Sequence, residues 1–370
     1  MMKPIRVLMV ITNLRVSNGV ASFAMNYFRR LSENVQMDFA LLSDIPSPYY
    51  DEIKAKGGKI HILPPLAKPA EHFRFCDRIF REEKYDIIHN NVSLKALPIM
   101  GVAKANGVPT RIMHGHSSRF SENAVKDRIN RILLPLMLNM ATDYAACSKV
   151  AALTWFKKKK YIIIPNVVSG KRLHYSEEKR AEIREKMNAE EKLIIGSVGR
   201  VAAEKNPVFA IGVIADLVTQ CPNVEYWWIG SGPMDQTLKE ETKRQHCEDH
   251  IRILGSRDDV PDLYQAMDLF FLPSLFEGLP VTGVEAQAMG LPCVISDSVT
   301  KELVYTDLVK YVSLDAPREE WIETLKGQLK RVPERRSYAA ELRGSVFSEE
   351  QAGDNLEKIY QRMMRKNTER

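Results

Sequence analysis

The chain has 370 residues, five cysteines and a formal net charge of +6. A chain of this length is longer than one that folds around a single hydrophobic core, so we predict two domains of roughly 150 to 200 residues each. The cysteines show no paired spacing, which argues against a disulfide framework and a zinc site. The first apolar stretch is too short for a secretory signal, and no run approaches the roughly 20 apolar residues that span a membrane. We therefore expect a cytoplasmic protein.

The charge is distributed unequally along the chain. Residues 1–165 contain 25 Lys and Arg against 13 Asp and Glu, whereas residues 166–370 contain 28 against 34. Basic side chains recur at helical spacing in residues 74–84 and 126–131, and residues 157–160 are four lysines. Basic helix faces resting on the anionic inner face of a membrane are one interpretation, and ordinary solvated helix faces are the other. No nucleic-acid-binding module accompanies the charge, so nucleic acid is not an expected partner.

Short apolar runs alternate with helix-length segments throughout the chain. This rhythm predicts two α/β domains with parallel sheets. The turn-rich segment 165–170 precedes a charged helix predicted at 177–188, so we place the domain boundary after residue 168. A basic final helix is predicted at about 348–365. The predicted strands are Arg6–Ile11, Met37–Leu42, Lys59–Leu63, Ile87–His89, Thr110–Met113, Asp143–Ala146, Tyr161–Ile164, Leu193–Gly199, Val224–Gly230, Ile251–Leu254, Leu269–Pro273 and Cys293–Ser296.

Polar residues follow several strands of the first half. Asn18-Gly19 lies in the loop after the first strand, just before a helix predicted at about 20–31. His89 ends one strand, and His114 and His116 lie at the end of the next. Loops at the carboxyl ends of parallel strands face the ligand crevice, so the three imidazoles are predicted near its edge. A structural role is equally open for each histidine, and no third ligand supports a zinc site at His114 and His116.

Two cations follow the first strand of the second half. Arg200 and Lys205 lie in the loop between that strand and a helix that Asn206-Pro207 is predicted to begin, as N-cap and first helical residue. Fixed cations near a helix N-terminus suit a pyrophosphate, whose negative charge must be held. Taken singly, each would more often be a surface charge.

Two further loops of the second half carry weaker signals. Gly230 and Gly232 follow a strand, but without a third glycine they form a weak dinucleotide fingerprint. Arg257 lies in the polar segment 254–260 and is either a ligand contact or a solvated loop residue.

Residues 274–286 place two carboxylates between two buried strands. Glu277 lies in the loop, and Glu285 lies about five residues into a helix that Pro280 is predicted to begin, roughly 7.5 Å along its axis. The two carboxylates can therefore address different parts of one extended ligand. Ordinary solvated acids are the alternative.

The Phe-Glu-Gly-Leu-Pro run at 276–280 and the Glu-Ala-Gln-Ala-Met-Gly-Leu-Pro-Cys-Val run at 285–294 resemble the signature of retaining GT-B glycosyltransferases. The Gly-Arg at 199–200 followed by Lys-Asn at 205–206 is similar to a second motif of that family, which includes bacterial capsule and exopolysaccharide enzymes. The resemblance implies two Rossmann-like domains facing across a cleft. We expect an acceptor-side domain at 1–168, a nucleotide-sugar domain at 169–347, and a final helix at 348–370 that returns to the first domain.

The resemblance also implies roles for these residues. Arg200 and Lys205 would stabilise the departing nucleoside diphosphate, Glu277 would orient the sugar, and His116, or else His114, would contact the sugar. The loop at Asn18-Gly19 replaces the family's usual two glycines, and its shape would survive if Asn18 adopts a positive φ. Glu285 would anchor the ribose. The other implied donor contacts are Gly19, Gly230, Gly232, Arg257, Gly278, Leu279 and Thr282, with His89, His114 and Asn18 at the cleft.

The implied activity is transfer of a hexosyl or N-acetylhexosaminyl group, with retention, from a nucleotide-sugar, UDP-sugar being favoured. The acceptor would be a glycan or a lipid-linked glycan. No cofactor or metal is expected, since the chain has no Asp-x-Asp triplet. A nucleotide-sugar epimerase of the same architecture and a noncatalytic nucleotide-sugar-binding protein are the alternatives.

Overall fold

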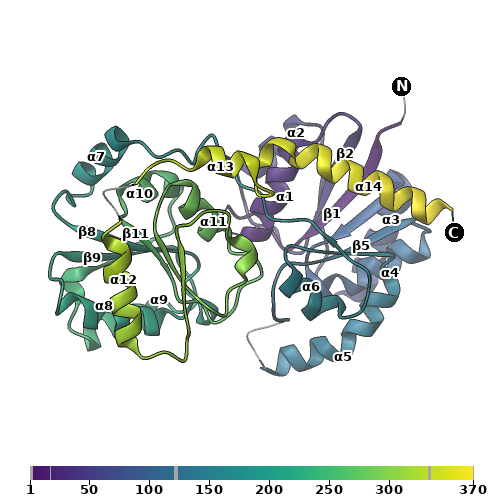
Figure 1. Cartoon of the computed structure of the whole chain (residues 1–370). Coiled ribbons are helices and arrows are strands. Elements are labelled where there is room, and N and C mark those ends of the chain that lie inside the picture. The colour runs from purple at the N-terminus through teal and green to yellow at the C-terminus, as the bar shows by residue number, and fades with distance from the viewer. Residues whose placement is uncertain (1–2, 17, 121–123, 332–334, 370) are drawn as a thin grey trace. The chain divides into compact units, whose positions relative to one another are not determined.

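The structure is a computed structural model that describes residues 3–16, 18–120, 124–331 and 335–369. The chain divides into two compact units (Figure 1). The N-terminal unit contains residues 1–167 together with 349–370, and the C-terminal unit contains residues 168–348. Each unit is an α/β layer structure with one parallel sheet, as the sequence predicted.

The sheet of the N-terminal unit has seven strands in the described part of the chain, in the order β3-β2-β1-β4-β5-β6-β7. Neighbouring strands pair in parallel, with Val7 opposite Met37 on one side and Ile87 on the other. The strands are β1 (Ile5–Ile11), β2 (Val35–Leu41), β3 (Ile60–Ile62), β4 (Ile87–Asn90), β5 (Thr110–Gly115), β6 (Asp143–Ala146) and β7 (Ile162–Ile163). The helices are α1 (Gly19–Arg30), α2 (Tyr49–Ala55), α3 (Pro69–Glu83), η1 (Ser93–Ala96), α4 (Leu97–Ala105), α5 (Ala124–Met140), α6 (Lys149–Phe156), η6 (Glu349–Gln351) and α14 (Ala352–Thr368).

Helix α14 packs on the N-terminal unit although it is last in the sequence (Figure 1). Glu357 accepts hydrogen bonds from the backbone and hydroxyl of Ser32, at 2.6 and 3.0 Å, just beyond the end of α1. Lys366 pairs with the buried Asp143 at 2.6 Å. A Cβ on Gly353 would lie 1.8 Å from the carbonyl oxygen of Arg30, so only glycine permits this approach of the two backbones.

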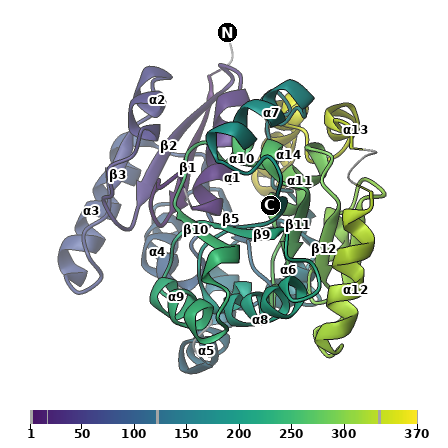
Figure 2. The same ribbon diagram turned by 90° about the vertical axis from the view of Figure 1, so that its left-hand side faces the viewer.

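The sheet of the C-terminal unit has six strands among the described residues, in the order β10-β9-β8-β11-β12-β13. Figure 2 shows α8 and α9 on one side of this sheet and α10 and α11 on the other. The strands are β8 (Leu193–Val198), β9 (Val224–Ile229), β10 (Ile251–Gly255), β11 (Leu269–Leu272), β12 (Cys293–Ser296) and β13 (Val309–Val312). The helices are α7 (Glu177–Lys186), η2 (Ala203–Lys205), α8 (Pro207–Val218), α9 (Asp235–Arg244), η3 (Glu248–His250), α10 (Val260–Ala266), α11 (Val281–Ala288), η4 (Lys301–Leu303), α12 (Arg318–Leu329) and α13 (Ala339–Gly344).

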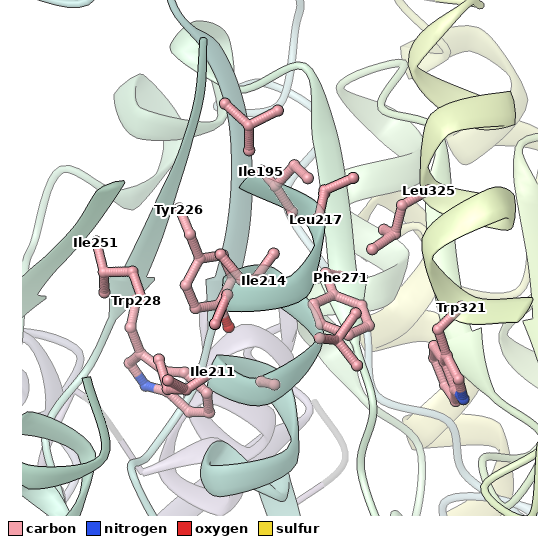
Figure 3. Packing of buried hydrophobic residues seen from close by; sticks show 14 of the residues in the cluster. Ile195, Ile211, Ile214, Leu217, Tyr226, Trp228, Ile251, Phe271, Trp321 and Leu325 are labelled. Atoms are coloured by element: carbon pink, nitrogen blue, oxygen red, sulfur yellow. The ribbon is translucent and has the colours of Figure 1, made fainter. Parts of the chain in front are cut away.

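A large hydrophobic core that includes four aromatic side chains packs against this second sheet (Figure 3). Helix α8 is apolar on almost every side because it lies against the sheet and also contacts α9 and α12. Trp321 of α12 meets Phe271 of β11 with ring centroids 5.7 Å apart. The labelled members of the cluster are Ile195, Ile211, Ile214, Leu217, Tyr226, Trp228, Ile251, Phe271, Trp321 and Leu325.

Two local predictions differ from the structure. Strand β13 was not predicted, because Lys310 and Tyr311 interrupt its apolar residues at the edge of the sheet. The final segment begins with η6, and α14 proper starts at Ala352. Within the described residues, no helix combines the length and apolar character needed to span a membrane.

Candidate functional site

The strand order of the C-terminal unit places its topological switch point between β8 and β11. Strands beyond β8 run toward β10 on one side, and strands beyond β11 run toward β13 on the other. In doubly wound sheets, ligands bind outside the carboxyl ends of the strands at this point. The loops there are residues 199–206 after β8 and 273–280 after β11.

Lys205 and Glu277 meet across the switch point. Lys205 Nζ lies 2.5 Å from Glu277 Oε1, and the two side chains are 14% and 13% exposed. The Ser274 hydroxyl donates to the same carboxylate oxygen at 2.8 Å. The backbone N–H of Leu275 donates to the carbonyl of Glu204 at 2.7 Å, which ties the two loops together. A cation and a carboxylate are therefore held in fixed positions at the edge where a nucleotide ligand would bind.

Arg200 is more exposed than Lys205. Its guanidinium lies 3.0 Å from Glu204, and its side chain is 53% exposed. Asn206 differs from the predicted helix cap. It occupies the N-cap position of α8, but its backbone is left-handed, at φ 56°, and its side chain makes no cap hydrogen bond. Pro207 is the first helical residue, as predicted.

The glycines after β9 allow the backbone of their loop to approach that of the loop after β8. Gly230 has φ 133°, and a Cβ there would lie 2.1 Å from the carbonyl oxygen of Gly199. A Cβ on Gly232 would lie 2.3 Å from the carbonyl oxygen of Val201. Packing of the loop that carries Arg200 therefore requires both glycines, independently of any ligand.

We expect Gly230→Ala to destabilise the C-terminal unit by about 3 kcal/mol or more, because the new methyl group meets backbone at a strained φ. Thermal unfolding measures this effect. Gly327→Ala is the matched control, since a Cβ at that position in α12 has no heavy atom within 4 Å. Equal melting temperatures of the Gly230→Ala protein and the wild type would contradict the packing argument.

Glu285 is the fifth residue of α11 and is partly buried. Tyr264 donates its phenolic hydroxyl to Glu285 Oε2 at 3.1 Å. Burial raises the pKa of Glu285 to about 7, although the Tyr264 hydrogen bond and the charge of Arg172 act in the opposite direction. The hydroxyl of Thr282, one turn earlier, is buried without a hydrogen-bond partner. Pro280 is the N-cap of α11 rather than its first helical residue.

The other predicted donor contacts of this unit lie at different distances from the switch point. Gly278 and Leu279 are buried where the 273–280 loop enters α11. Arg257 follows β10, the edge strand, two strands from the switch point. It pairs with Asp259 through two contacts of 2.8 and 2.6 Å at the surface. The structure therefore does not bring Arg257 together with Lys205 and Glu277.

The loop after β1 differs from its predicted conformation. Asn18 has φ −91°, so the positive φ under which the family's loop shape would survive is not adopted. Instead, its side chain caps α1 by accepting from the N–H of Val20 at 3.0 Å, and it donates to Asn13. Gly19 is the first residue of α1, and a Cβ there would meet no heavy atom within 4 Å. A side-chain cap therefore shapes this loop, because Asn18 satisfies a free N–H group of the first helical turn.

The three histidines form one stack inside the N-terminal unit. His89 Nε2 lies 3.0 Å from His114 Nδ1, and the rings of His114 and His116 stack with centroids 4.0 Å apart. His89 Nδ1 lies 2.8 Å from the hydroxyl of Tyr360 in α14. Phe23 of α1 packs edge-on against the His114 and His116 rings. His89 and His114 are buried, whereas His116 is only partly buried by its neighbours.

Asn91 fixes the orientation and tautomer of His116. The Asn91 amide nitrogen donates to the carbonyl of His89 at 3.0 Å, so its oxygen faces His116 Nε2 at 2.8 Å. That oxygen can only accept, which places the His116 proton on Nε2 and leaves Nδ1 as an acceptor. Burial lowers the pKa of His116 to about 3, so the ring is neutral at physiological pH.

We expect the N-terminal unit to lose stability as the pH falls from about 7 to about 5. Burial lowers the pKa of His89 and of His116 to about 3, from an ordinary value of 6.5, and also lowers the pKa of His114. The unfolded chain then binds more protons in this window, so stability present above pH 6.5 is lost on acidification. Urea unfolding of wild type and His116→Gln checks this. Between the two pH values, the unfolding free energy of the variant should fall by about 1 to 2 kcal/mol less than that of the wild type. Equal decreases for the two proteins would contradict the lowered pKa of His116.

Four contact residues were missed in the sequence. Ser274 lies beside Glu277, and Asn91 follows a strand end, so the general rule for parallel sheets could have indicated both. Tyr264 and Tyr360 come from α10 and α14, far along the chain from Glu285 and His89, and no local pattern marks them. No group of three or more His, Cys, Asp or Glu side chains with metal-site geometry occurs among the described residues.

The two doubly wound units define the GT-B class of α/β proteins. The solved structure of Anabaena Alr3699/HepE in complex with UDP-glucose superposes with a TM-score of 0.78 at 17% identity, and the match covers 96% of this chain and 98% of that one. At this identity the similarity shows the fold.

Sequence comparison then identifies the family. The model described as "Glycosyl transferases group 1" matches residues 179–332. The putative glycosyltransferase EpsF of Bacillus subtilis strain 168 is 30% identical over 335 residues, covering 86% of both chains. The UDP-Gal:alpha-D-GlcNAc-diphosphoundecaprenol alpha-1,3-galactosyltransferase of Escherichia coli is 26% identical over 232 residues, covering 60% of both chains. The chain belongs to the glycosyltransferase group 1 family and is a glycosyltransferase.

Proposed function

We propose that this glycosyltransferase moves a hexosyl or N-acetylhexosaminyl group from a UDP-sugar to a glycan or lipid-linked glycan, with retention of anomeric configuration. The observation that carries the proposal is the Lys205–Glu277 pair at the switch point of the C-terminal unit. It supplies a fixed cation for a diphosphate and a fixed carboxylate for sugar hydroxyls at one place. The printed name of the E. coli relative, a UDP-galactose enzyme with a diphosphoundecaprenol-linked acceptor, favours this donor and acceptor class.

Each residue has a distinct role in the proposed reaction. Lys205, with the more exposed Arg200, stabilises the charge that develops on the departing diphosphate. Glu277 accepts hydrogen bonds from the sugar and positions it, and a diphosphate oxygen takes the acceptor proton. Glu285 accepts hydrogen bonds from the ribose. His116 Nδ1 accepts a hydrogen bond from a sugar hydroxyl. This nitrogen is unprotonated because the ring proton is on Nε2, which donates to Asn91.

Three further elements of the proposal rest on the sequence, through its resemblance to the family, its apolar runs and its charge distribution. The reaction needs no cofactor and no metal, and the positive charge comes from Lys205 and Arg200. The enzyme acts on the cytoplasmic side, peripherally on the membrane, in synthesis of capsule or exopolysaccharide. Gly19, Gly230, Gly232, Gly278, Leu279, Thr282 and Arg257 contribute donor contacts.

Purified protein incubated with UDP-, GDP- and ADP-sugars tests the donor. We expect UDP-sugars alone to raise the melting temperature and to undergo slow hydrolysis. NMR of the released sugar, recorded before mutarotation, gives the stereochemistry, and the inverted anomer would refute retention. A donor sugar converted to its epimer without an acceptor would identify the epimerase alternative. Binding without any turnover across an acceptor panel would identify a noncatalytic binding protein.

A further inference from the structure

Helix α5 carries an exposed apolar stripe. Val125 and Ile132 are 68% and 70% exposed, and Ile129, Leu133 and Leu136 are also exposed. At about 100° per residue, these five side chains fall within a sector of about 100° on one side of the helix. Leu134, on the opposite side, and Met137, about 40° beyond the edge of the sector at Leu133, are buried against the unit. The stripe is therefore a face without a packing partner among the described residues, and not the face by which α5 is attached.

Helix α6 also carries exposed apolar side chains. Leu153 and Val150, three residues apart, are 60% and 39% exposed. Phe120 joins the two helices, because its ring packs 4.4 Å from Trp155 of α6 and lies 5.2 Å beneath the guanidinium of Arg131 of α5. Figure 1 shows α5 and α6 adjacent within the N-terminal unit. Half of the large hydrophobic side chains that are exposed among the described residues lie on these two helices.

Basic side chains border the stripe on both sides. On the helical projection of α5, Lys126 lies beyond one edge of the apolar sector and Arg128 beyond the other. Four exposed lysines, residues 157–160, directly follow α6. The segment 119–160 contains nine Lys and Arg and three acids. Two of these acids are neutralised, since Asp127 pairs with Arg131 and Asp143 pairs with Lys366.

We propose that the surface formed by α5 and α6 inserts into the headgroup boundary of an anionic lipid bilayer. The apolar helix face would contact the acyl chains of the bilayer, and the cations that border it would contact the lipid phosphates above them. A second copy of the chain fits less well, because each copy would present the same excess of positive charge to the other. The inference deepens the peripheral membrane association of the proposed function and rests on it in that respect. Vesicle binding is measured without donor or acceptor, so it can fail independently of the transfer reaction.

Co-sedimentation of the full chain with lipid vesicles tests the inference. Binding is expected to vesicles of phosphatidylglycerol mixed with phosphatidylcholine, to weaken with added salt, and to be absent with phosphatidylcholine alone. The variant Val125→Ser/Ile132→Ser/Leu136→Ser should lower the partition coefficient at least about tenfold. Lys126→Gln/Arg128→Gln should lower it by about tenfold.

Matched controls separate this surface from general hydrophobicity and charge. Leu66→Ser/Val346→Ser removes two exposed apolar side chains elsewhere, and Lys239→Gln/Lys243→Gln removes two exposed cations of α9. Both should bind like wild type, and all variants should keep the wild-type melting temperature. Equal vesicle binding by the triple serine variant and the wild type would overturn the proposal, as would absence of binding to anionic vesicles. A wild-type dimer that the serine variant converts to a monomer would instead assign the surface to a second copy.

Discussion

Replacing Lys205 by Met should lower kcat by about 100- to 1000-fold, with a much smaller change in KM. The Lys205 ammonium is nearly buried and held in place by Glu277 and the loop that Ser274 anchors. A preorganised cation acts most strongly where charge develops during reaction, so its loss affects the transition state more than donor binding. Steady-state kinetics with the donor identified by the screen measures both constants.

The ion pair complicates this variant, because removal of one partner leaves the Glu277 carboxylate partly buried without its cation. Lys205→Met/Glu277→Gln removes that charge and should regain melting temperature without regaining kcat. Lys239→Met, on the exposed surface of α9, is the matched lysine control and should keep wild-type kinetics. A Lys205→Met protein with unchanged kcat would remove Lys205 from the catalytic machinery.

Replacing Glu285 by Ala should weaken UDP-sugar binding by about 30- to 100-fold, since two hydroxyl hydrogen bonds to a carboxylate are lost. Burial raises the pKa of Glu285 to about 7, so the wild-type site also becomes protonated as the pH falls. Affinity of the wild type should therefore decrease from about pH 8 to about pH 6. Isothermal titration measures both effects, and a UDP-sugar is the suitable probe because its diester phosphates do not titrate in this range.

Glu285→Gln separates ligand binding from folding. A raised carboxyl pKa means that the folded protein binds more protons between pH 4.5 and 7, so this stabilisation is lost as the pH rises through 7. Gln carries no charge to lose, so the variant should exceed wild type by about 1 to 3 kcal/mol at about pH 8.5 and match it near pH 5. Its UDP-sugar affinity should be low and independent of pH. If the Glu285→Gln protein binds the UDP-sugar with the affinity and pH dependence of the wild type, the Glu285 carboxylate does not bind the ribose.

Most of the fold could be predicted because buried parallel strands are continuous apolar runs. Leu269–Leu272 and Cys293–Ser296 contain only buried residues, and both were predicted within one residue of their observed bounds. Strand β13 was not predicted, because an edge strand buries only part of its surface and its sequence therefore need not be a continuous apolar run. The rule that parallel strands are joined by right-handed crossovers limits the possible strand orders, and the structure shows which of them is adopted.

The candidate site was predicted less completely. The loops that carry Arg200, Lys205 and Glu277 could be recognised from their strand-loop-helix setting, but nothing local indicated that Lys205 pairs with Glu277, 72 residues away. The glycines were predicted as ligand contacts, and the structure adds a packing requirement at Gly230 and Gly232. The sequence argument for Asn18 concerned the tolerance of asparagine for a positive φ. In the structure Asn18 instead caps the first turn of α1.

By itself, the sequence determined the class of fold, the strand-loop-helix units and the residue types available to bind a sugar nucleotide. These depend on hydrophobic periodicity and turn chemistry, which act between near neighbours. Tertiary structure decided which charges pair, which histidine keeps a free acceptor nitrogen, and which apolar helix face stays exposed in the described part of the chain. Those properties depend on distances and burial between segments far apart in sequence, as in the contact of Tyr360 with His89 and that of Tyr264 with Glu285.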